Sequence, residues 1–417
     1  MPKNIPPARR KPGPKPAPTV DRTDELIEDL AVLALEVAEQ EEADPVAIAR
    51  KKDELQKMVR NALRKKQDEV LYGAIEHARF DDVDAYVLLR GQIEEAAASI
   101  VLRGDGKAVE EIDAFLVPVF INSPAGLRRQ DAFQDAAAFE LLRASFQQAG
   151  LEADSASVVL ISHLYDVDEI DRISYGELNE MLREVAATMG EKKMVPTPAL
   201  SNSIAALRDD TENAEGVEKA AESSAAGEGG ATELRFLLGF VRRTLDDPFY
   251  AIPTDEAGAS AWFDARLERY RGWTLAADAL LRACVATEPG EVSLNFLYQN
   301  QFFAAKRQAM AEGEILMLMA DIGAALAEHV LEAAHGGAVV GPVAQEADVA
   351  LRVALYRNGD AAALAAFELP FDMAEDLQGS VDELCEVLHG MGIASLSTAG
   401  RFGADGVAAD VKPWVPG

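Results

Sequence analysis

The stretch Phe115-Leu116-Val117-Pro118-Val119-Phe120-Ile121 decides the fold class of this chain. It is short, apolar throughout and rich in aromatic and β-branched residues, a pattern that predicts a buried strand. Because proline has no N–H to donate to a neighbouring strand, Pro118 predicts a bulge or a sheet edge. Helical patterns lie on both sides of this strand, so the sequence predicts an α+β protein.

Strand and helix patterns alternate after residue 121. Asn358-Gly359 is the strongest hairpin signal in the chain, whereas Gly336-Gly337 and Gly341-Pro342 predict a turn. The expected elements are a helix ending at Gly150, a strand at 158–161, a helix at 175–189, a strand at 234–241, a helix ending at Val285, a strand at 292–297, two helices at about 299–311 and 314–334, a strand pair at 349–356 and 361–371, a helix at 381–388 and a strand at 393–396.

Three stretches share a strand–helix–strand order, at about 112–164, 233–298 and 351–398. This order suggests repeated α+β units, and it is compatible with a ferredoxin-like arrangement. Two of the helices also end alike, at 146–151 and 388–393. Helices commonly end in glycine, so this likeness leaves a true duplication open.

Residues 23–103 predict a helical region that precedes the strands. Apolar residues from Leu26 to Val37 recur on one helix face. Asp44-Pro45 resembles an N-cap with proline at the first helical position, and another helix is expected near Asp81-Asp82.

Two segments are expected to be disordered. Residues 1–20 contain seven prolines and five basic residues with no acidic one, which predicts a disordered arm over residues 1–22. Residues 196–232 are rich in Ala, Glu, Ser and Gly and predict a linker. The chain is thereby divided into a helical region at 23–103, an α+β unit at 104–195 and an α+β domain at 233–417.

Charge is distributed unevenly along the chain. The net charge is −31, yet residues 1–66 hold 14 basic and 12 acidic residues. An acidic body repels nucleic acid and anionic membranes, so any contact with them is expected from the first 66 residues. Within the arm, the candidate nucleic-acid contacts are Arg9, Arg10, Lys11 and Lys15, which would attract phosphates. The alternative is a solubilising tail, or a tether for an acidic partner.

A second basic segment lies in the helical region. Lys57, Arg60 and Arg64 are spaced by three and four and so share a helix face. That face could extend the nucleic-acid contact of the arm, but pairing with the acidic body of the same protein is the favoured interpretation.

The segment from His163 to Asp171 is a candidate acidic site. His163, Asp166, Asp168 and Asp171 follow a predicted strand, where a histidine and carboxylates could bind a metal or act as acid and base. Their spacing does not match a calcium-binding loop. The favoured alternative is an acidic loop that caps the helix starting near Ser174.

A second candidate surface is the segment Leu294–Phe303, the densest aromatic and amide stretch in the chain. It could line a pocket or a partner surface. The favoured alternative is a core strand that runs into a packed helix.

The remaining patterns predict no cofactor or metal site. Cys284 and Cys385 have neither metal-ligand spacing nor a disulfide framework and are expected to be buried thiols. The glycines at 227–230 lack the preceding strand of a phosphate-binding loop. No run of about 18 uncharged apolar residues occurs, so no membrane contact is expected and the cytoplasm is the expected location.

Several of these patterns together resemble a known family. The chain resembles domain-of-unknown-function family 2863 of Gram-negative bacteria over residues 23 to about 402. The resemblance is carried by Phe115–Ile121, by His163-Leu164-Tyr165-x-x-Asp168, and by residues 292–309 with the long helix that follows them. The resemblance implies no activity and no site residues. Many members carry Cys-x-x-Cys after an Arg-Phe pair, but here Arg401-Phe402 is followed by no cysteine.

The leading hypothesis for function is a non-enzymatic cytoplasmic binding or regulatory protein that acts through protein partners. It is motivated by an acidic α+β body without a convergent catalytic set, a long linker and a charged arm. The alternatives are a nucleic-acid-associated protein that uses the arm, and a hydrolase-type or metal-dependent enzyme with a site at His163–Asp171. The oligomeric state is left open.

Overall fold

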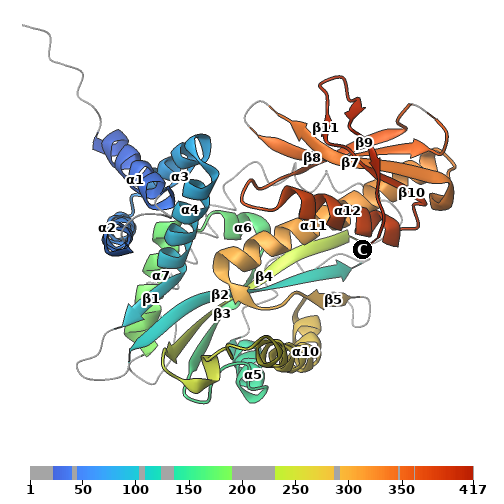
Figure 1. Ribbon diagram of the computed structural model, residues 1–417. Helices are drawn as coiled ribbons and strands as arrows, with labels where there is room; N and C mark the ends of the chain where they lie inside the picture. Colours follow the sequence, from blue (N-terminus) through green and yellow to red (C-terminus); the bar gives the residue numbers. More distant parts are fainter. Residues whose placement is uncertain are drawn as a thin grey trace, which may run out of the picture.

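The computed structural model describes residues 22–39, 45–102, 109–123, 136–189, 231–285, 292–345, 348–360 and 362–416. In these residues the protein is α+β, as the sequence predicts, with two sheets, a group of N-terminal helices and one long helix that joins the two sheets (Figure 1). No helix of the described part is long and apolar enough to cross a membrane.

The first sheet is built around β2 (Glu110–Ser123), which contains the stretch 115–121. On one side β2 pairs along its whole length with β4 (Ala231–Thr244), and β4 pairs with β3 (Ser157–Tyr165). On the other side it pairs with β1 (Ser99–Leu102), β6 (Asn300–Gln301) and β5 (Ser293–Phe296). All these pairings are antiparallel, and the order β5–β2–β4–β3 is that of a ferredoxin-like unit.

The first two strand–helix–strand stretches are therefore the two interleaved halves of one sheet. Strands β2 and β3 belong to the predicted unit of residues 104–195, and most of β4 belongs to the predicted domain of residues 233–417. Because β4 is hydrogen-bonded to both β2 and β3, the two predicted parts share one sheet. The predicted arm and almost all of the predicted linker between these units lie outside the described residues.

Pro118 lies inside the central strand, and the expected irregularity is found in the strand beside it. Val119 pairs with Phe296 of β5 and Leu116 with Asn300 of β6, so residues 297–299 face only two residues of β2. Because of this bulge, no backbone acceptor of β5 or β6 is left unpaired opposite Pro118, which has no N–H to donate. The Pro118 carbonyl still accepts a hydrogen bond from the N–H of Leu297 at 3.0 Å.

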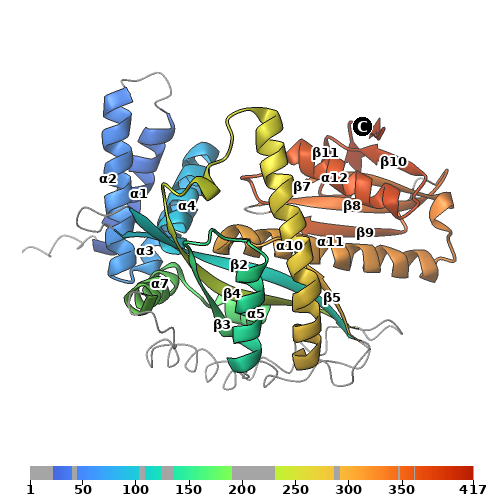
Figure 2. The ribbon, with the colours of Figure 1, turned by 90° about the horizontal axis from the view of Figure 1, so that it is seen from below.

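Helices cover both faces of the first sheet (Figures 1 and 2). One face of β2, with Phe115, Val117 and Val119, packs against α5 (Ala136–Gln148) and α10 (Glu256–Val285). The other face packs against α7 (Tyr175–Met189) and the start of α11 (Phe302–Glu328). Burial on both faces explains why the stretch is apolar without alternation.

Gly239 of β4 is required by close packing inside this sheet. It lies directly opposite Phe115, and a Cβ atom at this position would be 2.3 Å from Cζ of the Phe115 ring. We expect Gly239→Ala to lower the free energy of unfolding by about 1–3 kcal/mol, because the ring must leave its position over the glycine. Urea unfolding followed by circular dichroism measures this change.

Gly272 of α10 provides the matched control for that substitution. A Cβ at Gly272 meets no atom within 4 Å, so Gly272→Ala is expected to raise stability by about 0.5–1 kcal/mol through helix propensity alone. Equal effects of the two substitutions would contradict the packing argument.

The N-terminal helices form a separate core at one end of the first sheet. They are α1 (Arg22–Ala38), α2 (Pro45–Arg64), α3 (Asp68–Asp81) and α4 (Val83–Ala98). Asp82 caps α4 by accepting a hydrogen bond from the Ala85 N–H, close to the predicted start at Asp81-Asp82. This confirms the predicted helical region as far as Ala98; the prediction is wrong for Ser99–Leu102, which form strand β1 and pair with β2.

The second sheet is built around β7 (Gly336–Ala344). One edge of β7 pairs with β8 (Val349–Arg357), which pairs with β9 (Ala365–Pro370), confirming the hairpin expected at Asn358-Gly359. The other edge pairs in parallel with β10 (Ser395–Thr398) and β11 (Arg401–Phe402). Short strands at Ala408–Ala409 and Lys412–Pro413 add to β11 and β10, and α12 (Leu377–Gly390) covers one face.

The prediction of a turn at Gly336-Gly337 and Gly341-Pro342 is wrong, because these residues belong to the central strand β7. The glycines are needed for close approach: a Cβ on Gly341 would lie 2.6 Å from the Ala399 carbonyl oxygen. Pro342 lies between the residues that pair with β10 and with β11, where the neighbouring edge is interrupted.

Helix α11 joins the two sheets. The sequence predicts two helices here, at about 299–311 and 314–334, but the structure has one continuous helix of 27 residues, about 40 Å long. Its first turns bury Phe302 and Ala305 against the first sheet, and its last turns bury Ile322 and Leu326 against the second. One glycine, Gly313, costs too little to break a helix packed at both ends.

Candidate functional site

The predicted acidic site begins at an irregular end of β3. Leu160 pairs with Gly239 and Leu164 with Leu237, so residues 161–163 bulge out of the ladder and His163 lies within the bulge. The short helix α6 (Val167–Asp171) follows at once. Asp166 is its N-cap, and with Glu169 it forms a reciprocal capping box in which each side chain accepts from the backbone N–H of the other residue.

His163 and Glu169 form a buried pair. The Nε2 atom of His163 lies 2.9 and 3.0 Å from the two carboxylate oxygens of Glu169. Because an ionised carboxylate only accepts, Nε2 carries the proton in this contact. Burial alone would raise the pKa of Glu169, but the hydrogen bond and charge of His163, with the Asp166 N–H, lower that pKa below its ordinary value.

The other predicted acidic residues point to separate partners. Asp166 lies 3.7 Å from the guanidinium of Arg235, and Asp171 is paired with Lys306 at 2.6 Å. Asp168 is exposed. The structure therefore brings His163 and Asp166 together around Glu169, but it does not bring Asp168 and Asp171 to them. Within the described ranges, no three His, Cys, Asp or Glu side chains are arranged to hold a metal ion.

Glu169 is the residue that the sequence interpretation missed. The signal for it is the spacing Asp166-x-x-Glu169, which is that of a capping box. The expected cap thus exists, but it caps α6, which starts at Val167, and not the helix that starts after Ser174. The segment's polar groups are mostly engaged in holding the end of β3 to α6.

Glu169→Gln tests this structural role. We expect the free energy of unfolding to fall by about 1–2 kcal/mol at neutral pH, since the charge-assisted hydrogen bond to His163 is lost. The depressed pKa of Glu169 means that this contribution is present at neutral pH and is lost on acidification, so the difference should shrink towards acidic pH.

Asp168→Asn is the control for the loss of a carboxylate in α6. Asp168 is exposed, so its replacement is expected to change stability by less than about 0.5 kcal/mol. Thermal unfolding across pH compares the two variants, and an equal loss in both would show that the buried pair is not what stabilises this segment.

The basic residues show a different outcome. Arg9, Arg10, Lys11 and Lys15 lie outside the described residues. On α2, Lys57 pairs with Asp53 of its own helix at 2.5 Å, and Arg60 and Arg64 are exposed and pair with no described residue. Among the described residues the expected pairing with the acidic body is therefore not found for these three, whereas Lys66, just after the helix, pairs with Glu180 of α7.

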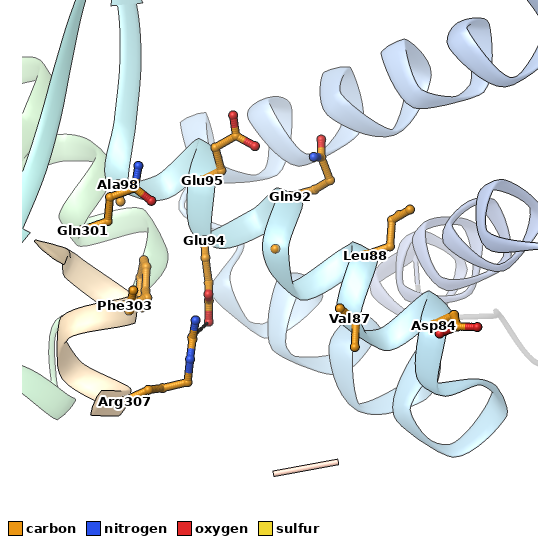
Figure 3. Close-up of a pocket in the computed structure, with 12 residues that line it drawn as sticks. Asp84, Val87, Leu88, Gln92, Glu94, Glu95, Ala98, Gln301, Phe303 and Arg307 are labelled. Atoms are coloured by element: carbon orange, nitrogen blue, oxygen red, sulfur yellow. Dashed lines mark hydrogen bonds and ion pairs between the residues drawn. The ribbon is translucent and has the colours of Figure 1, made fainter. Parts of the chain in front are cut away.

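A groove lies between α4 and the start of α11 (Figure 3). It is open to solvent and has a volume of about 540 Å³. One face of α4 forms its length, since residues spaced by three and four along that helix line it. The lining residues are Asp84, Val87, Leu88, Gly91, Gln92, Glu94, Glu95 and Ala98 of α4, with Gln301, Phe303, Ala304 and Arg307 on the other side.

The groove carries more carboxylates than cations. Arg307 is paired with Glu94, as Figure 3 shows. Asp84 and Glu95 are exposed, and neither makes a hydrogen bond or an ion pair with a described residue. A groove with uncompensated acidic groups and an apolar floor favours a ligand with positive charges and apolar groups between them.

Gly91 keeps the middle of the groove open. A Cβ atom at Gly91 would meet no atom within 4 Å, so no packing requires glycine here. Glycine in a helix interior costs about 0.5–1 kcal/mol relative to alanine. Gly91 therefore marks a position where a side chain would occupy the groove without disturbing the fold.

Partly buried ion pairs connect α4, which forms one side of this groove, to the second sheet. Arg90 donates to the hydroxyl of Tyr86 at 2.6 Å and to the carboxylate of Asp372 at 2.5 Å. Its Nε lies 3.7 Å from Glu94, which also binds Arg307. Asp372 lies between β9 and α12, so this network ties α4 and α11 to the second sheet.

The sequence predicted one side of this groove and missed the other. Of the aromatic and amide segment Leu294–Phe303, Phe302 is buried in the core, whereas Gln301 and Phe303 line the groove, so both interpretations hold for part of it. The α4 side was missed because a helical pattern does not indicate which face of the helix is left uncovered. Only Gly91, a glycine inside a helical pattern, gives a signal there.

No protein-family model matches the chain, and neither the comparison with curated proteins nor that with solved structures gives a match. The resemblance to family 2863 therefore stays a prediction from the sequence.

Proposed function

We propose that this protein is a non-enzymatic binding or regulatory protein of the cytoplasm that acts through protein partners, which it receives in the groove between α4 and α11. The observation that carries the proposal is the pair of carboxylates Asp84 and Glu95, which pair with no described residue and lie in an open groove with an apolar floor. The partner segment would be basic, with apolar side chains that pack against Val87 and Phe303.

Exposed apolar side chains next to the groove support a protein partner. Phe80 is 69% exposed, and Val83 and Val87 are 40% and 42% exposed. All three lie where α3 ends and α4 begins, at the Asp84 end of the groove. An apolar area beside unpaired charge is typical of an interaction surface.

Site-specific photo-crosslinking in the host cell tests this function. Gln92→benzoylphenylalanine places a photoreactive group in the groove of the full-length protein, and mass spectrometry identifies what it captures. We expect one protein partner to be captured through a basic segment, several-fold more than by the same group at Leu275, an exposed position on α10.

Two substitutions at Gly91 provide the matched pair. Gly91→Arg fills the groove and adds a like charge for a basic partner, so capture should be lost, whereas Gly91→Ala should retain it. Both residues favour a helix over glycine, so neither should destabilise the protein. Capture that is unchanged in Gly91→Arg would overturn the groove as the partner site.

A second candidate function is nucleic-acid association. The observation that favours it is the exposed pair Arg60 and Arg64 on α2, which pair with no described residue although the protein is strongly acidic. With Lys57 they give three cations on one helix face, and the arm residues Arg9, Arg10, Lys11 and Lys15 would add to them.

Binding of a fluorescent duplex at several salt concentrations tests this candidate. Replacing Arg60 and Arg64 by glutamine should reduce the slope of log K against log salt by about 2, because each arginine would neutralise one phosphate. Replacing the four arm cations tests the arm separately. An unchanged slope in both variants would exclude these residues as phosphate contacts.

A further inference from the structure

We infer that the groove between α4 and α11 is the docking site of the chain's own basic arm, with residues 9–16 as the bound segment. This inference rests on the same groove as the proposed function but not on the existence of a partner. It predicts that the groove is covered in the free protein and that a partner must displace the arm.

The spacing of charges in the arm matches that in the groove. Asp84 and Glu95 are 11 residues apart on α4, which corresponds to about 16 Å along a helix. Arg10 and Lys15 are five residues apart, which corresponds to about 16 Å in the extended conformation that prolines favour. An arm laid along α4 would therefore place one cation at each uncompensated carboxylate.

The residues between these two cations suit the middle of the groove. Pro12, Gly13 and Pro14 have no charge and no long side chain. Prolines in an extended segment pack well on apolar and aromatic surfaces, and the groove offers Val87 and Phe303. Gly91 leaves the space that such a segment needs.

Charge favours the arm over residues 190–230, the longest other segment outside the described residues. Residues 1–20 hold five basic residues and no acidic one, whereas 190–230 hold four basic and eight acidic residues. The groove would attract the first and repel the second. The arm also leads directly into α1, which packs against α4, so tethering gives it a high effective concentration at the groove.

Photo-crosslinking of the purified full-length protein tests the inference. With Gln92→benzoylphenylalanine and no partner present, we expect the main crosslinked peptide to come from residues 9–16. A mixture of isotope-labelled and unlabelled protein should show that the crosslink lies within one chain. The same group at Leu275 should not capture the arm.

Replacing Arg9, Arg10, Lys11 and Lys15 by glutamine should reduce this crosslink about tenfold, the combined effect of several exposed ion pairs. Gly91→Arg should reduce it as well, whereas Gly272→Arg, which adds the same side chain at an open position on α10, should not. A crosslink to another segment, to the arm of a second copy, or one that survives charge removal would overturn the inference.

The outcomes separate this inference from the proposed function. If a partner is captured in the cell but no arm crosslink forms in the purified protein, the proposed function stands and the inference about the arm is wrong. If the arm crosslink forms but no partner is captured, the inference about the arm stands and the proposed function is wrong.

Discussion

Replacing Arg90 by methionine is expected to lower the free energy of unfolding by about 2–4 kcal/mol. Arg90 and Asp372 are only 17% and 23% exposed, so removing the guanidinium leaves a carboxylate largely buried without its counter-charge. The expected loss is smaller than for a fully buried ion pair, because the side chains of Arg90 and Asp372 keep some exposure to solvent. Methionine keeps the apolar stem of the side chain, so the loss reports on the charge.

The position of Asp372 explains why one side chain has such an effect. Burial alone would raise the pKa of Asp372, but the backbone N–H of Ala374 and the guanidinium of Arg90 lower it below its ordinary value. The carboxylate is thus held ionised at the joint between β9 and α12. Without Arg90, the connection between the second sheet and the N-terminal helices would rest on α11, on the ion pair of Arg79 with Asp348 and on the packing of Ala374 against the N-terminal core.

Tryptophan fluorescence separates the two parts of the molecule during unfolding. Trp273 lies in the core of the first sheet, and Trp414 packs on the second. Variants that retain one of these residues report each part, and we expect Arg90→Met to move the Trp414 transition further than the Trp273 transition. Coincident shifts of both transitions would contradict the idea that Arg90 mainly secures the second sheet.

Two substitutions serve as controls for Arg90→Met. Tyr86→Phe removes one hydroxyl from the same network and should cost no more than about 1.5 kcal/mol. Arg143→Met removes an exposed pair with Glu140 on α5 and should cost less than about 1 kcal/mol.

Local patterns were sufficient to predict most helices and several of the strands. The helix at 175–189, the hairpin at Asn358-Gly359 and the strand at 158–161 follow from periodicity and turn chemistry alone, and all are confirmed. The repeated strand–helix–strand units were compatible with a ferredoxin-like arrangement, but the strand order itself depends on the pairing of β2 with β4, which connects residues more than 100 apart.

The two central prolines had different outcomes, since the strand around Pro118 was predicted but the strand around Pro342 was not. Pro118 and Pro342 each lie in the central strand of a sheet, where proline is normally excluded. Each is tolerated because the neighbouring edge is interrupted at that point, between β5 and β6 or between β10 and β11. That interruption is a property of a distant segment, so β7 could not be recognised from its own residues.

The candidate site was only partly predictable for a similar reason. A histidine followed by carboxylates at the end of a strand indicates a site, but the structure uses Glu169 and Asp166 to cap α6. The groove depends on which face of α4 is left uncovered, and this is set by where α11 begins to pack. Residue types along α4 do not contain that information.

Asp113→Asn is expected to raise the free energy of unfolding at pH 8 by up to about 3 kcal/mol. Asp113 is 6% exposed and lies on β2, where Oδ2 is 2.8 Å from Arg243 and Oδ1 has no hydrogen-bond partner among the described residues. Burial raises the pKa of this carboxyl to about 6, against the lowering effect of Arg243. A shift of about two pKa units corresponds to about 3 kcal/mol.

The sign of this effect determines its dependence on pH. Between about pH 4 and 6 the folded protein keeps a proton on Asp113 that the unfolded chain has released, so stability falls as pH rises through this window. Asparagine resembles the protonated carboxyl and removes the penalty. The variant should therefore match the natural protein near pH 4 and exceed it in stability above pH 6.

Urea unfolding of both proteins from pH 4 to pH 8 measures the difference directly, since the other titrating groups cancel between them. Glu110→Gln is the control: Glu110 pairs with Arg242 on the neighbouring strand β4 but is 37% exposed, so its removal should change stability by less than about 1 kcal/mol. If Asp113→Asn destabilised the protein at pH 8, the carboxylate would be a net stabilising partner of Arg243. The pair would then have to attract strongly enough to outweigh the loss of water around both charges.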